Sequence, residues 1–142
     1  MFYKPPIDLK DEDVDPLLRK AVAKINSSGW VWTAESCQGH PDAKGPPWAD
    51  NVQPMLRLVT KKEDFPRMLG HLIESLEVPA REVEGWLWPE TILACEMYPV
   101  SHGDWREVLV YVHARTAFDR DNGIIAFERF ADAVSDNSFP DR

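Results

Sequence analysis

Residues 15–36, DPLLRKAVAKINSSGWVWTAES, hold a helix signal, a stop signal and a strand signal in one short run. Asp15-Pro16 is typical of an N-cap followed by proline at the first helical position. Ser27-Ser28-Gly29 predicts the end of this helix, with Gly29 as the left-handed residue that terminates it. Over residues 14–25, apolar residues recur at the spacing of one helical stripe: Val14, Leu17, Leu18, Ala21, Val22 and Ile25.

The stretch 30–36 is rich in aromatic and β-branched residues, which favour strands. Two-residue alternation predicts that Trp30, Trp32 and Ala34 share one face of this strand. The loop that follows, 37–48, contains several Gly and Pro residues, and these rule out regular structure there.

The remaining chain repeats a strand–loop–strand–helix plan, which gives the order α-ββα-ββα. The predicted elements are strands at about 53–60, 91–98 and 107–114, a helix after Asp64, and a last helix capped by Asp121 or Asn122. The apolar stripe of the helix after Asp64 is Phe65, Met68, Leu69, Leu72, Ile73 and Leu76, and the inward residues of the last helix are Ile124, Phe127, Ala131 and Val134. This order predicts one α+β domain over residues 14–136, with a four-stranded, largely antiparallel sheet and three helices. A polar arm at 1–13 and a polar tail at 137–142 flank it.

The charge balance of the chain limits its partners. Sixteen Lys and Arg against 24 Asp and Glu leave a net charge of −8 in 142 residues. Such a surface repels phosphate backbones, so we expect no bulk nucleic-acid binding and no membrane association. Two cysteines cannot form a disulfide framework, and no secretory or membrane-spanning segment is evident. We therefore expect a soluble, cytoplasmic protein, with a small molecule or another protein as partner; the sequence leaves the oligomeric state open.

The loop after the first predicted strand carries a resemblance to a known family. Ser36-Cys37-Gln38-Gly39-His40 follows a helix that ends in an Asn-Ser turn. This arrangement resembles the N-terminal part of the wybutosine-synthesising tRNA methyltransferases, whose loop reads Ser-Cys-Ser-Gly-Arg. Ser36, Cys37 and Gly39 match, whereas Gln38 and His40 replace Ser and Arg, and Glu35 replaces a small hydroxyl residue. The loop also resembles that of small uncharacterised bacterial and phage proteins with a Ser-Cys-x-Gly-His sequence. The resemblance implies a related α/β fold and, as an alternative function, S-adenosylmethionine-dependent modification of a nucleoside or tRNA.

We predict a ligand pocket at this loop. Gly39 can adopt a positive φ, while Ser36 and Cys37 end a rigid strand and His40 adds a group that titrates near neutral pH. The competing interpretation is a buried, inert Cys37 in a plain turn. A metal site on Cys37 and His40 would need scattered partners, so we predict none; the partners weighed are His71, Cys95, His102 and His113.

A second Gly-His loop contains His102, Asp104 and Trp105. If the first strands of the two ββα units run parallel, both loops leave the sheet at one end and form one cleft. Antiparallel first strands would place the loops at opposite ends. We predict the shared cleft, with Glu35 or Asp104 orienting the histidines. Trp48 and Trp105 are expected either to cover the core or to form a stacking platform in this cleft. Cys37 as a nucleophile with His40 or His102 as its base is a further hypothesis.

The sequence thus predicts a binding or regulatory module with a pocket at Cys37–His40, since no complete catalytic constellation is visible. The alternatives are the methyltransferase-like enzyme and an acidic module that docks on a basic protein surface. Trp86 and Trp88, in the predicted connector 79–90, are expected to cover a sheet edge or to form a dimer contact.

Overall fold

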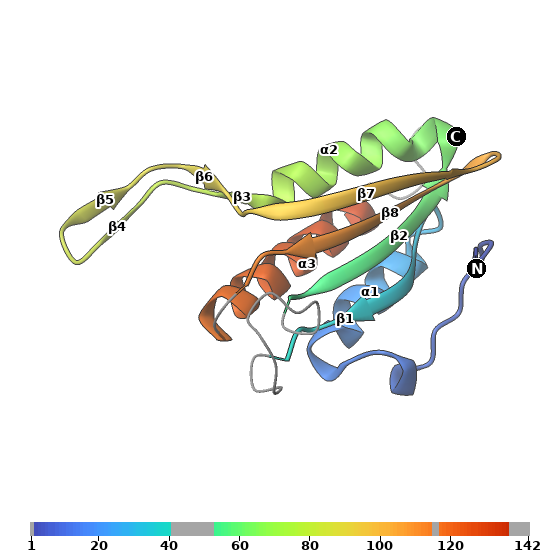
Figure 1. Cartoon of the computed structure of the whole chain (residues 1–142), viewed down its shortest axis with the longest axis horizontal. Helices are drawn as coiled ribbons and strands as arrows, with labels where there is room; N and C mark the ends of the chain where they lie inside the picture. Colours follow the sequence, from blue (N-terminus) through green and yellow to red (C-terminus); the bar gives the residue numbers. More distant parts are fainter. Residues whose placement is uncertain (1, 41–52, 115–116, 137–142) are drawn as a thin grey trace.

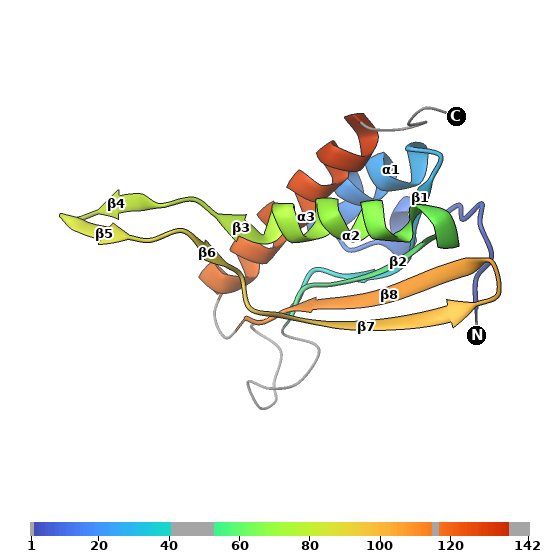
Figure 2. The ribbon, with the colours of Figure 1, turned by 90° about the horizontal axis from the view of Figure 1, so that it is seen from above.

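The computed structural model describes residues 2–40, 53–114 and 117–136. Its main sheet has the strand order β1 (Val31–Cys37), β2 (Met55–Lys61), β8 (Trp105–Val112) and β7 (Cys95–His102), with every neighbouring pair antiparallel. Helices α1 (Arg19–Ser27), α2 (Phe65–Leu76) and α3 (Ala117–Asp136) lie together on one side of this sheet (Figures 1 and 2). The α+β prediction is confirmed. Within the described residues, no helix combines the length and apolar character that a membrane span requires.

The core fills the space between the helices and one face of the sheet. On β8, Val108, Val110 and Val112 are buried, as the alternation of a half-covered strand requires. The helical stripes supply the opposite wall, and the predicted inward residues of α3 are all buried: Ile124, Phe127, Ala131 and Val134. Leu17 and Ile73 were expected in such stripes but are exposed; Leu17 lies in the 3-10 turn before α1, and Ile73 lies on α2.

Trp30 and Trp32 do not share a face. Trp30 precedes β1 and is buried on the helix side, where its indole Nε1 donates a 3.0 Å hydrogen bond to the carbonyl of Val134. Trp32 lies within β1 opposite Val59, on the face that no helix covers. The prediction was wrong because alternation begins only at Val31, after the turn at Gly29, whose φ of 82° confirms the predicted left-handed helix end.

A β-bulge interrupts β1 between Thr33 and Glu35. Thr33 pairs with Leu58, Glu35 pairs with Arg57, and Ala34 is the extra residue between them. The bulge shifts the alternation by one residue, so Glu35 and Cys37 lie on the same side of the sheet as Trp32.

The last helix begins at Ala117, before the predicted caps Asp121 and Asn122. Its glycine, Gly123, serves close packing rather than a helix boundary. A Cβ built at Gly123 would lie 2.7 Å from Cγ of Pro54 and 3.1 Å from Cγ1 of Val112, so only glycine lets α3 approach the sheet here.

The predicted connector 79–90 is a two-stranded ribbon. Its strands and their neighbours are β3 (Glu77–Val78), β4 (Arg81–Val83), β5 (Trp86–Trp88) and β6 (Thr91–Ile92). Short 3-10 turns precede α1 and α2: η1 (Asp11–Asp13), η2 (Pro16–Leu18) and η4 (Lys62–Asp64). Strand β3 pairs with β6 and β4 pairs with β5, and together they form an arm, residues 77–92, that projects from the body (Figures 1 and 2). Trp86 therefore covers no edge of the main sheet, and its side chain is 74% exposed.

Candidate functional site

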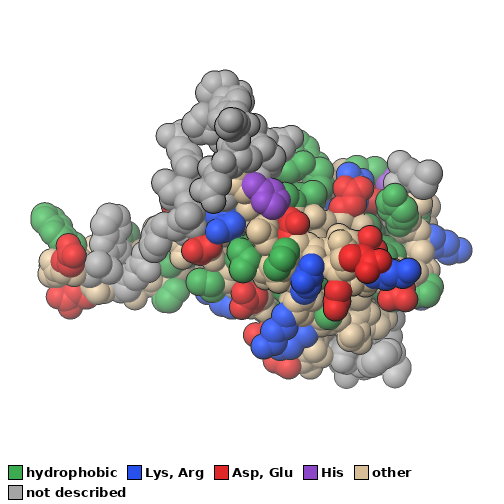
Figure 3. Space-filling view, turned by 90° about the horizontal axis from the view of Figure 1, so that it is seen from below, with side chains coloured by type: hydrophobic (Ala, Val, Ile, Leu, Met, Phe, Trp, Pro, Cys, Tyr) green, Lys and Arg blue, Asp and Glu red, His purple; other side chains and the backbone are tan. Residues whose placement is uncertain are grey.

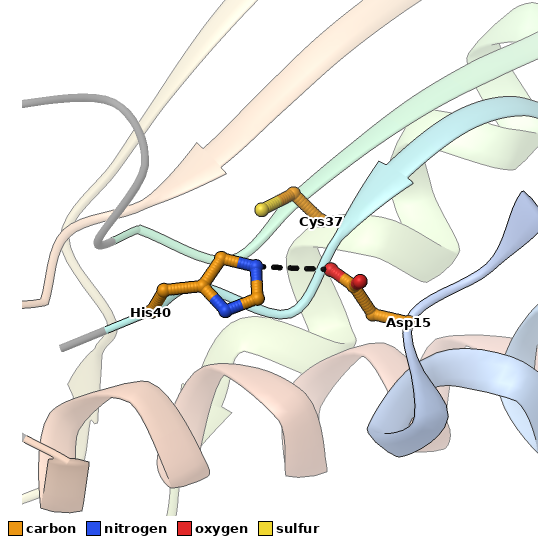
Figure 4. Close-up of side chains that lie close together, drawn as sticks. All are labelled: Asp15, Cys37 and His40. Carbon is orange, nitrogen blue, oxygen red and sulfur yellow. Dashed lines mark ion pairs between the residues drawn. The ribbon is translucent and has the colours of Figure 1, made fainter. Parts of the chain in front are cut away.

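Three side chains with metal-binding atoms meet where β1 ends. Cys37 is the last residue of β1, His40 follows it by three residues, and Asp15 comes from the turn that precedes η2. Cys37 Sγ, one imidazole nitrogen of His40 and one carboxylate oxygen of Asp15 all lie within 4.8 Å of one another (Figure 4). Among the described residues, no other group of three or more His, Cys, Asp or Glu has this property.

The loop backbone is held by reciprocal hydrogen bonds with the N-terminal turn. The Gln38 amide donates to Asp15 Oδ2 at 3.0 Å, and the Leu17 amide donates to Gln38 Oε1 at 3.1 Å. Asp15 was expected to cap the first helix, but its carboxylate makes no capping hydrogen bond. The chain enters α1 through the 3-10 turn η2, and the carboxylate bonds to Gln38 instead.

The other side of the loop is tied to α3. Arg120 Nη1 donates to the Gly39 carbonyl at 3.0 Å, and the Gly39 amide lies 3.4 Å from Cys37 Sγ as a donor. Gly39 has a φ of 81°, which confirms the predicted positive φ. Cys37 and His40 are thus positioned by contacts from the turn that precedes α1 and from α3.

The electrostatics of the cluster keep the thiol protonated. Burial raises the pKa of Cys37, and the nearby Asp15 carboxylate raises it further, while the hydrogen bond from the Gly39 amide lowers it. An activated cysteine nucleophile needs the opposite, a lowered pKa beside a cation. The free cluster is therefore a poor nucleophile.

His40 and Asp15 remain accessible to solvent, with side chains 46% and 31% exposed. His40 Nε2 lies 3.4 Å from Asp15 Oδ2, which is longer than a typical N–H···O hydrogen bond. The sequence offered Glu35 or Asp104 as the carboxylate beside a histidine. Glu35 instead lies 3.5 Å from Arg57 Nε, and the backbone carbonyl of Asp104 accepts the Lys62 amide in an exposed turn.

The prediction that the two Gly-His loops share one cleft is wrong. Cys37 pairs with Met55 at one end of the sheet, whereas His102 pairs with Trp105 at the end where Lys61 lies. Strands β1 and β7 run antiparallel because three antiparallel pairings separate their directions. The two Gly-His loops therefore leave the sheet at opposite ends. Trp48 lies outside the described residues.

His102 belongs to a separate cluster on the helix-free face. Its Nε2 lies 3.8 Å from Glu107 Oε2, and its ring stacks on Phe2 with centroids 4.2 Å apart. Glu107 is 6% exposed and accepts a 2.8 Å hydrogen bond from Arg57 Nη1. Trp105, predicted in a loop, is the first residue of β8 and makes an edge contact with Trp32 at 6.0 Å.

Arg57 and Glu107 were not among the predicted site residues. Their signal is a charged residue on each of two apolar strands, and the register makes them diagonal neighbours on one face, because Arg57 pairs with Leu109 and Glu107 pairs with Val59. Ser36, which was predicted in the pocket, pairs with Leu56 and has a buried Oγ without a hydrogen-bond partner among the described residues.

The other residues weighed as metal ligands lie elsewhere. His71 packs against Trp30 on α2, and His113 pairs with Glu96 at 3.3 Å beyond β8. Cys95 lies on β7, and burial alone raises its pKa. The prediction of no metal site considered only the local Cys37–His40 pair; the fold brings a third side chain with a metal-binding atom, Asp15, beside that pair.

Comparison with known proteins returned no matching family model, no matching curated protein and no matching solved structure. The resemblance to the wybutosine-synthesising family therefore stays a prediction, and the functional argument depends on the geometry of the chain itself.

Proposed function

We propose that this protein is a metal-binding module whose site consists of Asp15, Cys37 and His40. The observation that carries the proposal is the convergence of one sulfur, one nitrogen and one oxygen within 4.8 Å of one another. The site lies at the loop where the sequence predicts a binding pocket, so the proposal gives that pocket a ligand class.

The distances suit a small tetrahedral ion. Zinc binds imidazole nitrogen and carboxylate oxygen at about 2.0–2.2 Å, so two such ligands on a tetrahedron are about 3.3–3.6 Å apart. The 3.4 Å between His40 Nε2 and Asp15 Oδ2 falls in this interval. Cys37 Sγ is within 4.8 Å of both atoms, so a shift of about 1 Å brings it to the corresponding separation.

The donor set also selects the class of ion. Thiolate and imidazole favour zinc and other late transition metals, whereas Mg²⁺ and Ca²⁺ prefer oxygen alone. Binding to Cys37 requires loss of the thiol proton, and the raised pKa of Cys37 makes affinity rise with pH. Three protein ligands leave a fourth position for water or for an exogenous ligand, which is typical of open sites.

A Co²⁺ titration at neutral pH tests the proposal, because Co²⁺ replaces zinc and absorbs visibly when bound to thiolate. We expect one ion per chain, a sulfur-to-cobalt charge-transfer band, and displacement of Co²⁺ by Zn²⁺. Cys37→Ser should abolish the band and weaken binding at least about a hundredfold. Cys95→Ser is the matched control, because it removes the other half-buried thiol and leaves the site intact.

Two results would overturn the proposal: no thiolate band in the unmodified protein, or a band that depends on Cys95 rather than Cys37. The resemblance of the Ser36–His40 loop predicts a different ligand. A rise in melting temperature with S-adenosylmethionine, and none with Zn²⁺, would replace metal binding with the methyltransferase-like alternative.

A further inference from the structure

The arm formed by residues 77–92 has exposed apolar side chains far from the core. Trp86 and Leu87, at its free end, are 74% and 77% exposed. In Figure 3, hydrophobic and acidic side chains lie together at this end. A lone two-stranded ribbon is at best marginally stable in water, and three or more strands are needed for independent stability. The arm therefore lacks the partner strand that would stabilise it.

The turn at the tip determines which backbone groups are free. Glu84 and Gly85 have φ values of 51° and 82°, as in a two-residue type I′ turn. In such a hairpin the flanking pair, Val83 and Trp86, exchanges both hydrogen bonds. The next pair, Glu82 and Leu87, then directs its amide and carbonyl groups away from the ribbon. Each edge of β4–β5 thus offers one residue with an unused donor and acceptor.

We propose that two copies of this chain associate by antiparallel pairing of β5 with β5 about a twofold axis at Leu87. In this register, the Leu87 amide and carbonyl of each copy bond to those of the other, and Trp86 lies opposite Trp88 of the second copy. The product is a four-stranded sheet with an isologous interface.

The charges of the two edges favour β5. The same twofold pairing along β4 would place Glu82 opposite Glu82, and like charges directly opposite destabilise a sheet. Strand β5, Trp86-Leu87-Trp88, carries no charge and lacks the charged residues that protect natural edges.

The acidic surroundings argue against an anionic occupant of the edge. Glu82, Glu84 and Glu90 flank the tip, and the chain has a net charge of −8, so an anionic membrane or a nucleic acid would be repelled. The arm extends beyond the body, so two arms can meet without contact between the bodies (Figure 1). Three paired residues per copy form a small interface, and we expect a dimer in the micromolar range or weaker.

Sedimentation equilibrium over a concentration series tests the proposal with a pair of matched variants. Leu87→Pro removes the outward amide on β5 and leaves the β4–β5 hydrogen bonds in place; Glu82→Pro makes the same change on the opposite edge. We expect the unmodified protein and Glu82→Pro to dimerise, and Leu87→Pro to raise the dissociation constant about tenfold or more. A monomer at every concentration, or equal effects of the two variants, would overturn the proposal.

A disulfide test is independent of whether proline preserves the ribbon. In a hydrogen-bonded antiparallel pair the two Cα atoms are about 5.5 Å apart, within the range that a disulfide spans. With Cys37 and Cys95 replaced by serine, Leu87→Cys should form a covalent dimer on oxidation and Glu82→Cys should not. Equal cross-linking of the two variants, or none at Leu87→Cys, contradicts the pairing.

Discussion

At one end of the sheet, the segment Cys37–His40 leaves β1 and meets Asp15; at the other, the strands β7 and β8 are joined by the two-residue turn Gly103-Asp104. Each place sets a histidine beside a carboxylate. His40 lies 3.4 Å from Asp15, and His102 lies 3.8 Å from Glu107.

The two carboxylates differ in the other groups that they bind. Glu107 is buried and bound by the Arg57 guanidinium, so its charge is already balanced within the fold. Asp15 accepts a hydrogen bond from the neutral Gln38 amide and is partly open to water. Its charge is available to a bound cation. The comparison shows that the other partners of the carboxylate indicate whether a His–carboxylate pair is structural or open to a ligand.

The largest expected effect is on the stability of the buried pair. Glu107→Ala should lower the free energy of unfolding by about 3–5 kcal/mol, because it leaves Arg57 without its main counterion. Asp15→Asn keeps an oxygen for the Gln38 amide and should cost less than about 1 kcal/mol. Urea denaturation measures both values, and equal losses would erase the distinction between the two carboxylates.

The next effect is on metal affinity. His40→Ala should weaken Co²⁺ or Zn²⁺ binding about a hundredfold, whereas His102→Ala should leave it unchanged. Isothermal titration calorimetry at fixed pH compares the two variants. Weakened binding in His102→Ala would contradict the proposal, because it would mean that the ion binds at the opposite end of the sheet from Cys37.

For the free energy of unfolding, we expect the opposite ranking: the His102 substitution should cost more than the His40 substitution. His102→Ala removes the stack with Phe2 and should cost about 1 kcal/mol, which Phe2→Ala should reproduce. His40→Ala should change stability by less than about 0.5 kcal/mol, since the side chain is half-exposed. Thermal or chemical denaturation without added metal decides the point, and a larger cost for His40→Ala speaks against a ligand role.

The smallest effect concerns pH. Burial, followed by the charge of Asp15, raises the pKa of Cys37 above its ordinary value of about 9.0, so near that pH the folded chain holds the thiol proton more tightly than the unfolded chain. Stability from this source is present below about pH 9 and lost as pH rises through the raised pKa. Cys37→Ser should flatten the decline in stability above that pH, measured by denaturation at several alkaline values. An unchanged slope would show that the Cys37 environment is not as described.

The sequence predicts local features of this molecule well and long-range ones poorly. The stripe in α3 and the positive φ of Gly39 follow from spacing and residue type, and the structure confirms both. The sequence explained Asp15 fully as a helix cap, so it gave no reason to place this residue beside Cys37. The relative direction of β1 and β7 depends on strand order, which short-range patterns do not encode.

The arm was missed for a related reason. Glu84-Gly85 forms a type I′ turn, but Glu is an uncommon residue at its first position, so the usual Asn-Gly signal was absent. The two strands are also only three residues long, too short for alternation to be visible.

The bulge at Ala34 determines which face of the sheet the last residues of β1 occupy. Without it, Glu35 and Cys37 would continue the alternation of Val31 and Thr33, which are buried against the helices. Deleting Ala34 would remove the bulge and still keep both side chains on their present face, because Glu35 would then directly follow Thr33 and remain opposite Arg57. A regular strand of the same seven residues would therefore lose the site even with every ligand still in its sequence, whereas a six-residue strand without Ala34 would keep it.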